Sequence, residues 1–206
     1  MSWLVCMQLD KAALQQCHFG DSYAWHQAMW ECFPGMPDAK RDFLTRTVWL
    51  PNGCRLYMLC RSEPVRPVWC PPESWALKTV APTFLQHEAY AFDLLANPTR
   101  KVAAFTANGQ RAHNGKRLAL LDETSRQTWM QGKATQHGFC LDGFLSIEDA
   151  GTSVFWRRSR AGMHLGVRFR GRLHVTDREQ FIHAFYHGIG SAKAFGFGLL
   201  LLQPLL

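Results

Sequence analysis

A short segment near the N-terminus, DSYAWHQAMWECF, carries two side chains that can move protons. Tyr23 and His26 are three residues apart, so on a helix, which turns by about 100° per residue, they lie on the same side. The other side of this helix is a wide apolar stripe of Ala24, Trp25, Ala28, Met29, Cys32 and Phe33. Because the pKa of histidine lies near neutrality, Tyr23 and His26 form a candidate acid–base pair. Spacing alone leaves open a second interpretation, in which His26 is an ordinary surface histidine.

An arginine-rich segment, residues 153–175, is the second candidate site. It contains six arginines, and no acidic residue occurs between Asp149 and Asp177. A hairpin turn is expected at Ala161-Gly162, and strand alternation after it places on one face the side chains of Arg168, Arg170, Arg172 and His174. Solvated charged faces normally mix both signs, so a face of one sign indicates a site for phosphates or for the groove of a nucleic-acid helix.

The C-terminal segment HGIGSAKAFGFGLLLLQPLL contains four glycines within eleven residues and one lysine, Lys193. It fits neither the GxxxxGK[ST] pattern nor the GxGxxG pattern, and it runs from helix to strand, opposite to both nucleotide loops. Two interpretations remain open. The backbone and Lys193 bind a nucleic-acid backbone, or the glycines only allow a tight connection between a helix and a strand.

Metal sites are not expected. The seven cysteines form no CxxC pair, which argues against a disulfide framework and against structural zinc, and Cys54 and Cys60 fit a core better. His183 and His187 are spaced for chelation on a helix, but no HExxH glutamate accompanies them. Neither a metal nor a cofactor is therefore predicted, and a two-metal nuclease is disfavoured.

The charge is unevenly distributed along the 206 residues. Residues 1–98 carry 8 Lys/Arg against 9 Asp/Glu, whereas residues 99–206 carry 15 against 7. A basic second half indicates a polyanionic partner, and nucleic acid is the main candidate. The N-terminus lacks a basic leader, and the C-terminal apolar run is shorter than the roughly 20 residues that span a bilayer, so a cytoplasmic protein is expected.

The spacing of apolar and turn residues predicts an α+β fold. The elements expected in the first half are a strand over 3–9, a helix over 23–33, a hairpin over 44–60 with an Asn52-Gly53 turn, and a strand over 89–95. Those expected in the second half are a helix over 123–137, strands over 139–147, 153–159 and 164–175, a helix from Asp177 to Gly188, and a strand over 198–203. A short second helix after the Pro-rich connection at 64–72 would give the first half the order β-α-β-β-(α)-β, and the second half is assigned β-α-β-β-α-β. Two tandem ferredoxin-like domains are therefore predicted, 1–97 and 98–206.

Three sequence patterns coincide with those of a known family. They are the helix YAWHQAMW followed by FPGMPDAKRDFL, the middle segments AFDLLANPTRK and NGKRLAL, and the terminal GIGSAKAFGFGLLLLQPL. Over nearly its whole length the sequence resembles the CRISPR-associated endoribonucleases of the CasE type. The terminal glycine motif followed by a leucine-rich strand is highly specific.

The resemblance implies RRM-related ferredoxin-like domains that bind the stem-loop of a CRISPR repeat. It implies that precursor CRISPR RNA is cut at the 3′ base of the stem by attack of the upstream ribose 2′-hydroxyl, without a metal or a cofactor. The products would be a 2′,3′-cyclic phosphate, or its opened form, and a 5′-hydroxyl. The implied partners are the crRNA and other Cascade subunits, including the backbone subunit nearest the crRNA 3′ end. Target DNA would be met only through the complex, and no membrane is involved.

The resemblance also assigns site residues. His26 would move a proton at the reacting oxygens, and Tyr23 would position or stabilise the phosphate. The residues expected to bind RNA are Arg157, Arg158, Arg160, Arg168, Arg170, Arg172, Lys116, Arg117, Gly188, Gly190, Lys193, Gly196 and Gly198. Two departures from the family pattern are Asp93 with Leu95, where relatives often have arginine, and Ser191, where proline is common.

Two other functions remain open at this point. A non-catalytic RNA-hairpin-binding subunit on the same fold predicts tight, salt-dependent binding without scission. A metal-dependent nuclease predicts that activity is lost in EDTA.

Overall fold

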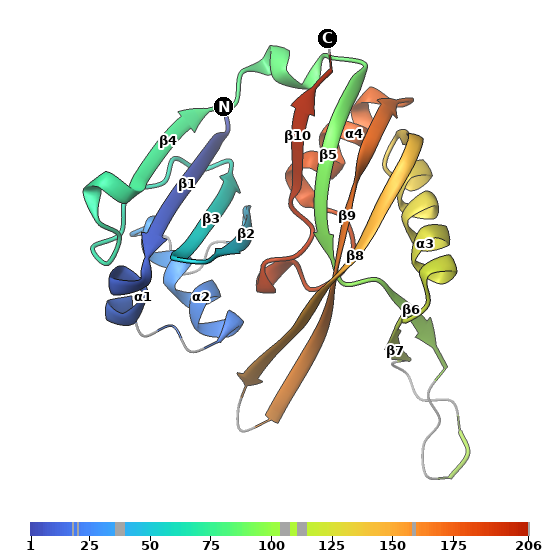
Figure 1. The fold of residues 1–206 in the computed structure, drawn as a ribbon, viewed down its shortest axis with the longest axis horizontal. Helices are drawn as coiled ribbons and strands as arrows, with labels where there is room; N and C mark the ends of the chain where they lie inside the picture. The colour runs from blue at the N-terminus through green and yellow to red at the C-terminus, as the bar shows by residue number, and fades with distance from the viewer. Residues whose placement is uncertain are drawn as a thin grey trace.

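The computed structural model describes residues 1–17, 19, 21–35, 40–103, 108–110, 115–157 and 160–205. Two four-stranded antiparallel sheets lie side by side, and a two-stranded sheet projects from the second (Figure 1). None of the helices in the described ranges is long and apolar enough to cross a membrane.

The first sheet has the strand order β2-β3-β1-β4. Its strands are β1 (Trp3–Asp10), β2 (Phe43–Leu50), β3 (Gly53–Cys60) and β4 (Trp75–Thr79). The helices α1 (Lys11–Cys17) and α2 (Ser22–Met29) follow β1, and a 3-10 turn, η1 (Trp30–Cys32), extends α2. The predicted hairpin is confirmed, with Leu50 paired to Gly53 across the turn. A short 3-10 turn, η2 (Pro72–Ser74), precedes β4 in place of a second helix.

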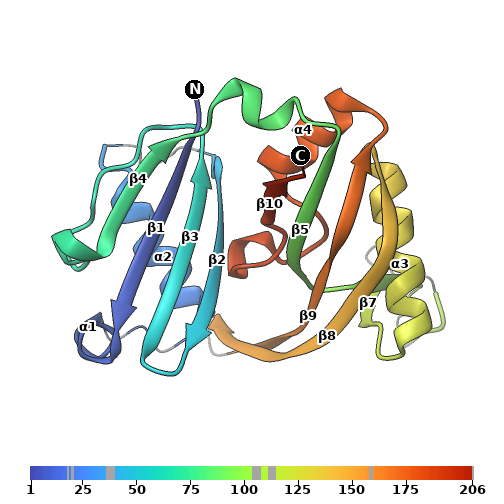
Figure 2. The same ribbon diagram turned by 45° about the horizontal axis from the view of Figure 1, so that its top comes forward.

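The second sheet has the order β10-β5-β9-β8. Its strands are β5 (Ala89–Ala96), β8 (Phe139–Arg157), β9 (Arg160–Val175) and β10 (Leu200–Pro204). The helices α3 (Glu123–Gln136) and α4 (Arg178–His187) cover one face (Figure 2). The smaller elements are η3 (Pro82–Leu85), β6 (Thr99–Val102), β7 (Lys116–Ala119) and η4 (Lys193–Phe195). Both four-stranded sheets have the ferredoxin-like order, so the predicted fold class is confirmed.

The strand over 89–95 exists, but its predicted place was wrong. It was expected to close the first sheet, whereas β5 pairs with β9 and β10 in the second. The physical reason lies in its alternation, because every second residue, from Tyr90 to Ala96, is buried in the core under α3 and α4. The sheets therefore divide between β4 and β5, before residue 89 and not after the predicted residue 97.

The arginine-rich region also differs from expectation. The predicted strands over 139–147 and 153–159 are one long strand, β8, with irregularities at Asp142/Ser146 and Asp149/Thr152. Arg157 of β8 pairs with Arg160 of β9, so Ala161-Gly162 lies inside β9 and is not the turn. Gly162 serves close packing there, since a Cβ atom would lie 2.2 Å from Cζ of Phe155.

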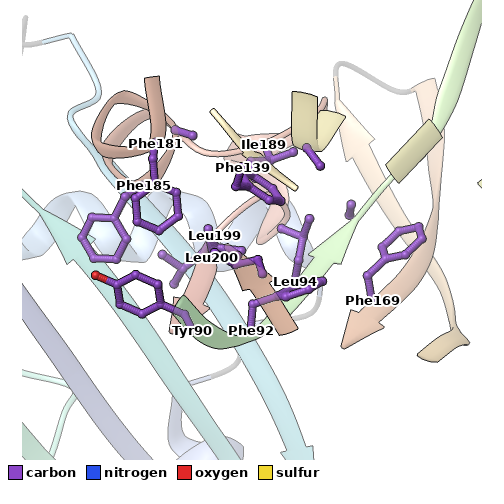
Figure 3. Close-up of a cluster of buried hydrophobic side chains, with 14 of the residues drawn as sticks. Tyr90, Phe92, Leu94, Phe139, Phe169, Phe181, Phe185, Ile189, Leu199 and Leu200 are labelled. Atoms are coloured by element: carbon purple, nitrogen blue, oxygen red, sulfur yellow. The ribbon is translucent and has the colours of Figure 1, made fainter. Parts of the chain in front are cut away.

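The core of the second unit fixes the helices on the sheet. Figure 3 shows Phe181 of α4, and Ile189 just after that helix, facing Leu94 and Leu200 of the sheet. Phe139, at the start of β8, packs against Phe181, with ring centroids 6.2 Å apart. The predicted helix boundaries of α4 are confirmed. Asp177 Oδ1 accepts from the Gln180 backbone N–H at 3.0 Å, and the helix ends at Gly188 with a φ of 75°.

Candidate active site and nucleic-acid interface

The N-terminus of α2 is tied to the second unit through Asp21. Asp21 Oδ1 caps the helix by accepting from the backbone N–H groups of Tyr23 and Ala24, at 3.0 and 2.8 Å. Its Oδ2 accepts from the backbone N–H of Trp156 on β8 at 2.9 Å. The hydroxyls of Ser22 and Ser153 lie 3.0 Å apart. The helix that carries His26 is thus held against the long β8–β9 hairpin, which reaches across to the first unit (Figure 2).

His26 is half-buried between aromatic rings. Its ring centroid lies 5.9 Å from that of Phe43 and 6.3 Å from that of Trp30. Nδ1 is buried and has no hydrogen-bond partner among the residues that the structure describes, which leaves Nε2 as the nitrogen that can exchange a proton with a bound molecule. Burial, and then the charge of Arg41, lower the pKa of His26 below 6.5. The imidazole is therefore neutral at pH 7 and able to accept a proton.

A cleft of about 510 Å³ lies where α2, β2, the β8–β9 hairpin and the glycine segment meet. His26, Arg46, Arg168 and Gly196 are among the residues that line it, and Tyr23 is not. Three helical residues correspond to a rotation of 300°, so the two side chains diverge by about 60°. The structure therefore brings His26 to the cleft and leaves Tyr23 beside it.

The prediction of a charged face of one sign was wrong. Asp93 on β5 binds Arg168, Glu148 on β8 binds Arg170, and Asp142 Oδ2 lies 3.4 Å from Nε2 of His174. The acids come from the strands on either side of β9, so the sequence of β9 alone does not reveal them. Arg172 is exposed and, within the described ranges, makes no ion pair.

Sequence reasoning missed Arg46, the charged residue that lies deepest in the cleft wall. Its side chain is 3% exposed, its Nη2 lies 2.7 Å from Asp93 Oδ1, and its Nη1 donates to the Asp93 carbonyl at 2.9 Å. Burial raises the pKa of Asp93, but the hydrogen bonds from Arg168 and the charge of Arg46 outweigh it, so this pKa lies below its ordinary value. The available signal was an arginine and an aspartate inside strands that carry no other charged residue.

The four predicted glycines all adopt the left-handed region. Their φ values are 75° at Gly188, 88° at Gly190, 85° at Gly196 and 88° at Gly198. Gly198 connects the segment to the sheet, because its N–H donates to the Leu95 carbonyl at 2.8 Å. A Cβ atom at Gly198 would lie 2.8 Å from the Ile189 carbonyl oxygen, whereas one at Gly196 would meet no atom of the described part of the chain within 4 Å. Packing thus accounts for Gly198, and Gly196 presents open backbone to the cleft.

Lys193 is the first residue of η4, and its side chain reaches back to the end of α4. Its ammonium donates to the carbonyls of His187 and Gly188, at 2.7 and 3.3 Å, and so caps the helix. Burial, followed by the charges of Arg41 and Lys133, lowers the pKa of Lys193. Its expected contact with an RNA phosphate stays a prediction.

The remaining predicted cations lie at the two projecting ends of the second unit. Lys116 and Arg117 are exposed on β7, away from the cleft lining. The backbones of Arg157 and Arg160 pair at the end of the β8–β9 hairpin, and Arg158 lies outside the described residues. No group of three or more His, Cys, Asp or Glu side chains that could hold a metal ion occurs in the described ranges.

Residues 2–204 match the family described as CRISPR associated protein. The chain belongs to this family. It is 29% identical over 210 residues to the CRISPR system Cascade subunit CasE of Escherichia coli (strain K12), covering 97% of this chain and 100% of that relative. It is 30% identical over 140 residues to the CRISPR-associated endoribonuclease Cse3 of Thermus thermophilus, covering 62% of this chain and 61% of that relative.

Solved structures of family members share the fold. A CRISPR endoribonuclease Cse3 bound to a 19 nt RNA superposes with a TM-score of 0.78 at 22% identity, covering 98% of this chain and 100% of that one. The CRISPR-associated protein Cas6e of E. coli K-12 superposes with a TM-score of 0.74 at 23% identity over 100% of both chains. The resemblance predicted from the sequence is confirmed.

Proposed function

We propose that this protein is a metal-independent endoribonuclease that binds the stem-loop of a CRISPR repeat and cuts precursor CRISPR RNA at the 3′ base of the stem. The observation that carries the proposal is His26, a histidine of lowered pKa on a fixed helix, in a cleft that also holds Arg46 and Arg168. The family relatives named CasE and Cse3, one of them described as an endoribonuclease, support the same function.

The proposed reaction uses the RNA's own nucleophile. The ribose 2′-oxygen forms a bond to the adjacent phosphorus, the bond from phosphorus to the 5′-oxygen breaks, and a 2′,3′-cyclic phosphate and a 5′-hydroxyl result. His26 takes the proton from the 2′-hydroxyl or delivers one to the leaving 5′-oxygen. Because the nucleophile is already part of the substrate, the reaction needs no metal-bound water.

Tyr23 and the cationic side chains act on the phosphate in this proposal. Tyr23 lies one turn before His26 beside the cleft, where its hydroxyl positions or stabilises the phosphate. Arg172, Lys116 and Arg117 are exposed, and with the hairpin arginines they hold the backbone of the stem. The glycine segment offers backbone donors at Gly196 next to the cleft.

The product stays bound, and the protein anchors a Cascade complex in the cytoplasm. Solved CRISPR RNA-guided surveillance complexes contain chains of this fold, with TM-scores of 0.71 and 0.68, which supports assembly with the other subunits. The partners are the crRNA and the backbone subunit nearest its 3′ end, and target DNA is met only through the complex.

The test is cleavage of the cognate repeat stem-loop in EDTA. The wild type is expected to cut once, and His26→Ala to lose at least about 100-fold in rate, which matches the loss of a general acid or base. Binding of the same RNA, with a 2′-deoxy nucleotide at the cut, is expected to stay within about twofold. No cleavage in EDTA, or cleavage that His26→Ala leaves unchanged, contradicts the proposal.

A non-catalytic RNA-hairpin-binding subunit is the second candidate. Two observations favour it: Tyr23 lies outside the cleft lining, and the ammonium of Lys193 is used to cap α4. Tight, salt-dependent binding of the stem-loop with no scission supports this candidate.

A further inference from the structure

One wall of the cleft is aromatic, and one of its rings is open to solvent. Trp49, on β2, lines the cleft and is 66% exposed. Its ring lies 6.5 Å from that of Trp25 at an interplanar angle of 81°, and the Trp25 ring in turn lies 4.7 Å from that of Phe19. Trp49 thus makes an edge-type contact with Trp25 and leaves most of its surface open to solvent. An exposed tryptophan beside a concave surface is a stacking platform for a nucleobase.

The other wall of the cleft is cationic. Nε and Nη2 of Arg168 bind Asp93, whereas its Nη1 has no partner among the described residues, and its side chain is 33% exposed. Arg46 binds the same carboxylate from the first sheet. At this wall, two guanidiniums against one carboxylate leave an excess of one positive charge, which matches the single negative charge of a phosphodiester. The carboxylate of Asp21, which also lines the cleft, accepts from the backbone N–H groups of Tyr23, Ala24 and Trp156.

The volume of the cleft limits the size of the RNA segment that it can hold. A cleft of about 510 Å³ is in the range of small-ligand sites, roughly 300–1,000 Å³. This is room for one nucleotide and far too little for an A-form stem. Bases that proteins read by stacking are unpaired bases, since a paired base has its faces covered by its neighbours.

We propose that the cleft binds one unpaired nucleotide of the RNA, with its base on Trp49 and its phosphate at Nη1 of Arg168. The inference rests on the proposed function, because His26 lines the same cleft and so places this nucleotide next to the cut. The exposed arginines and lysines hold the stem outside, and the cleft selects RNA that continues beyond the stem as a single strand.

The test compares two RNAs that carry a 2′-deoxy nucleotide at the cut. One ends at the base of the stem, and the other continues with unpaired nucleotides on the 3′ side. Trp49→Ala is expected to weaken binding of the extended RNA roughly 5- to 100-fold and to leave the truncated RNA within about twofold, because stacking of one base is lost. Trp49→Phe is expected to keep most of the difference in affinity between the extended and the truncated RNA.

Phe144→Ala is the matched control, since Phe144 is 84% exposed and lies outside the cleft lining. It is expected to leave the ratio of the two affinities unchanged. A 2-aminopurine at the first unpaired position reports stacking directly: its fluorescence falls on binding to the wild type and does not fall with Trp49→Ala.

The phosphate contact is tested with a neutral methylphosphonate at the unpaired nucleotide. It is expected to weaken binding to the wild type about 10-fold, as the loss of a charge-assisted hydrogen bond does, and to have no effect on Arg168→Gln. Equal effects on both proteins overturn the phosphate contact. If Trp49→Ala weakens binding of both RNAs equally, or weakens binding of neither, the stacking site is overturned. The proposed function survives this result as long as the wild type cleaves ribose-containing RNA. If the wild type cleaves no repeat RNA, the proposed function fails first.

Discussion

Asp93 on β5 binds Arg168 on the adjacent strand β9, with Arg168 Nε 3.1 Å from both carboxylate oxygens and Nη2 2.5 Å from Oδ2. The same carboxylate binds Arg46 of the first sheet. A single acidic side chain therefore joins the two units at the wall of the cleft. It also orients the arginine that we assign to the RNA phosphate.

Asp93→Asn is expected to destabilise the protein by about 2–4 kcal/mol, because it leaves the buried guanidinium of Arg46 without a counter-charge. Urea unfolding at neutral pH measures the change. Asp142→Asn is the control: its pair with His174 is half-exposed, so the expected cost is at most about 0.5 kcal/mol. Equal losses of unfolding free energy at the two positions would show that the ion pairs of Asp93 with Arg46 and Arg168 contribute no more than a surface pair.

Arg41→Gln is expected to move the pH profile of cleavage to higher pH. Burial lowers the pKa of His26 most, and the charge of Arg41 adds to this, so removal of that charge raises the pKa toward its ordinary value. If neutral His26 is the base, the acid limb of the rate moves up. If protonated His26 is the acid, the alkaline limb moves up. The sign is therefore the same for both roles.

Single-turnover rates between about pH 5 and pH 8 measure this shift. Lys40→Gln removes the neighbouring exposed cation and is expected to leave the profile unchanged. An unchanged profile with Arg41→Gln would mean that Arg41 does not act on the proton-transferring group.

Asp21→Ala is expected to slow cleavage more than it weakens RNA binding. The variant loses the cap of α2, which costs about 1 kcal/mol, and also the hydrogen bond to Trp156 that fixes the helix on the hairpin. Asp122→Ala is the matched control, because Asp122 caps α3 through the Ser125 N–H at 2.7 Å, on an element that does not line the cleft. The two variants are expected to lose similar amounts of protein stability. Only Asp21→Ala is expected to cleave RNA more slowly. If both variants cleave RNA more slowly, the loss of stability alone explains the slower cleavage by Asp21→Ala.

Gly198→Ala and Gly196→Ala are expected to separate packing from function in the glycine segment. Both residues have a positive φ, which costs alanine about 1–2 kcal/mol. Only at Gly198 does the new methyl group also collide with backbone, so its melting temperature falls further. Gly196→Ala is expected to keep the fold and to lower RNA affinity. A lower melting temperature for Gly196→Ala than for Gly198→Ala would contradict the predicted collision at Gly198.

Much of the molecule follows from local sequence. The Asn52-Gly53 hairpin, the helix over 123–137 and the cap of α4 by Asp177 depend on contacts within a few residues, and all three are confirmed. The class of fold follows as well, because the order of helices and strands allows few arrangements of short connections. The family follows from motifs that the chain itself contains.

What the sequence leaves open concerns contacts between distant segments. Alternation shows that β5 is a strand but does not say which sheet it joins, since that depends on which helices cover its apolar face. In the same way, the arginines of β9 read as a row of one sign until pairing brings Asp93 and Glu148 next to them.

The sequence by itself determined the fold class, the family and the candidate His26. Only the tertiary structure decided that His26 shares a cleft with Arg46, Arg168 and Trp49 and that Tyr23 lies outside its lining. The physical reason is that periodicity assigns a residue to a face of its own element. Which other element packs against that face depends on the burial of apolar side chains and the pairing of charges between segments that are distant in the sequence.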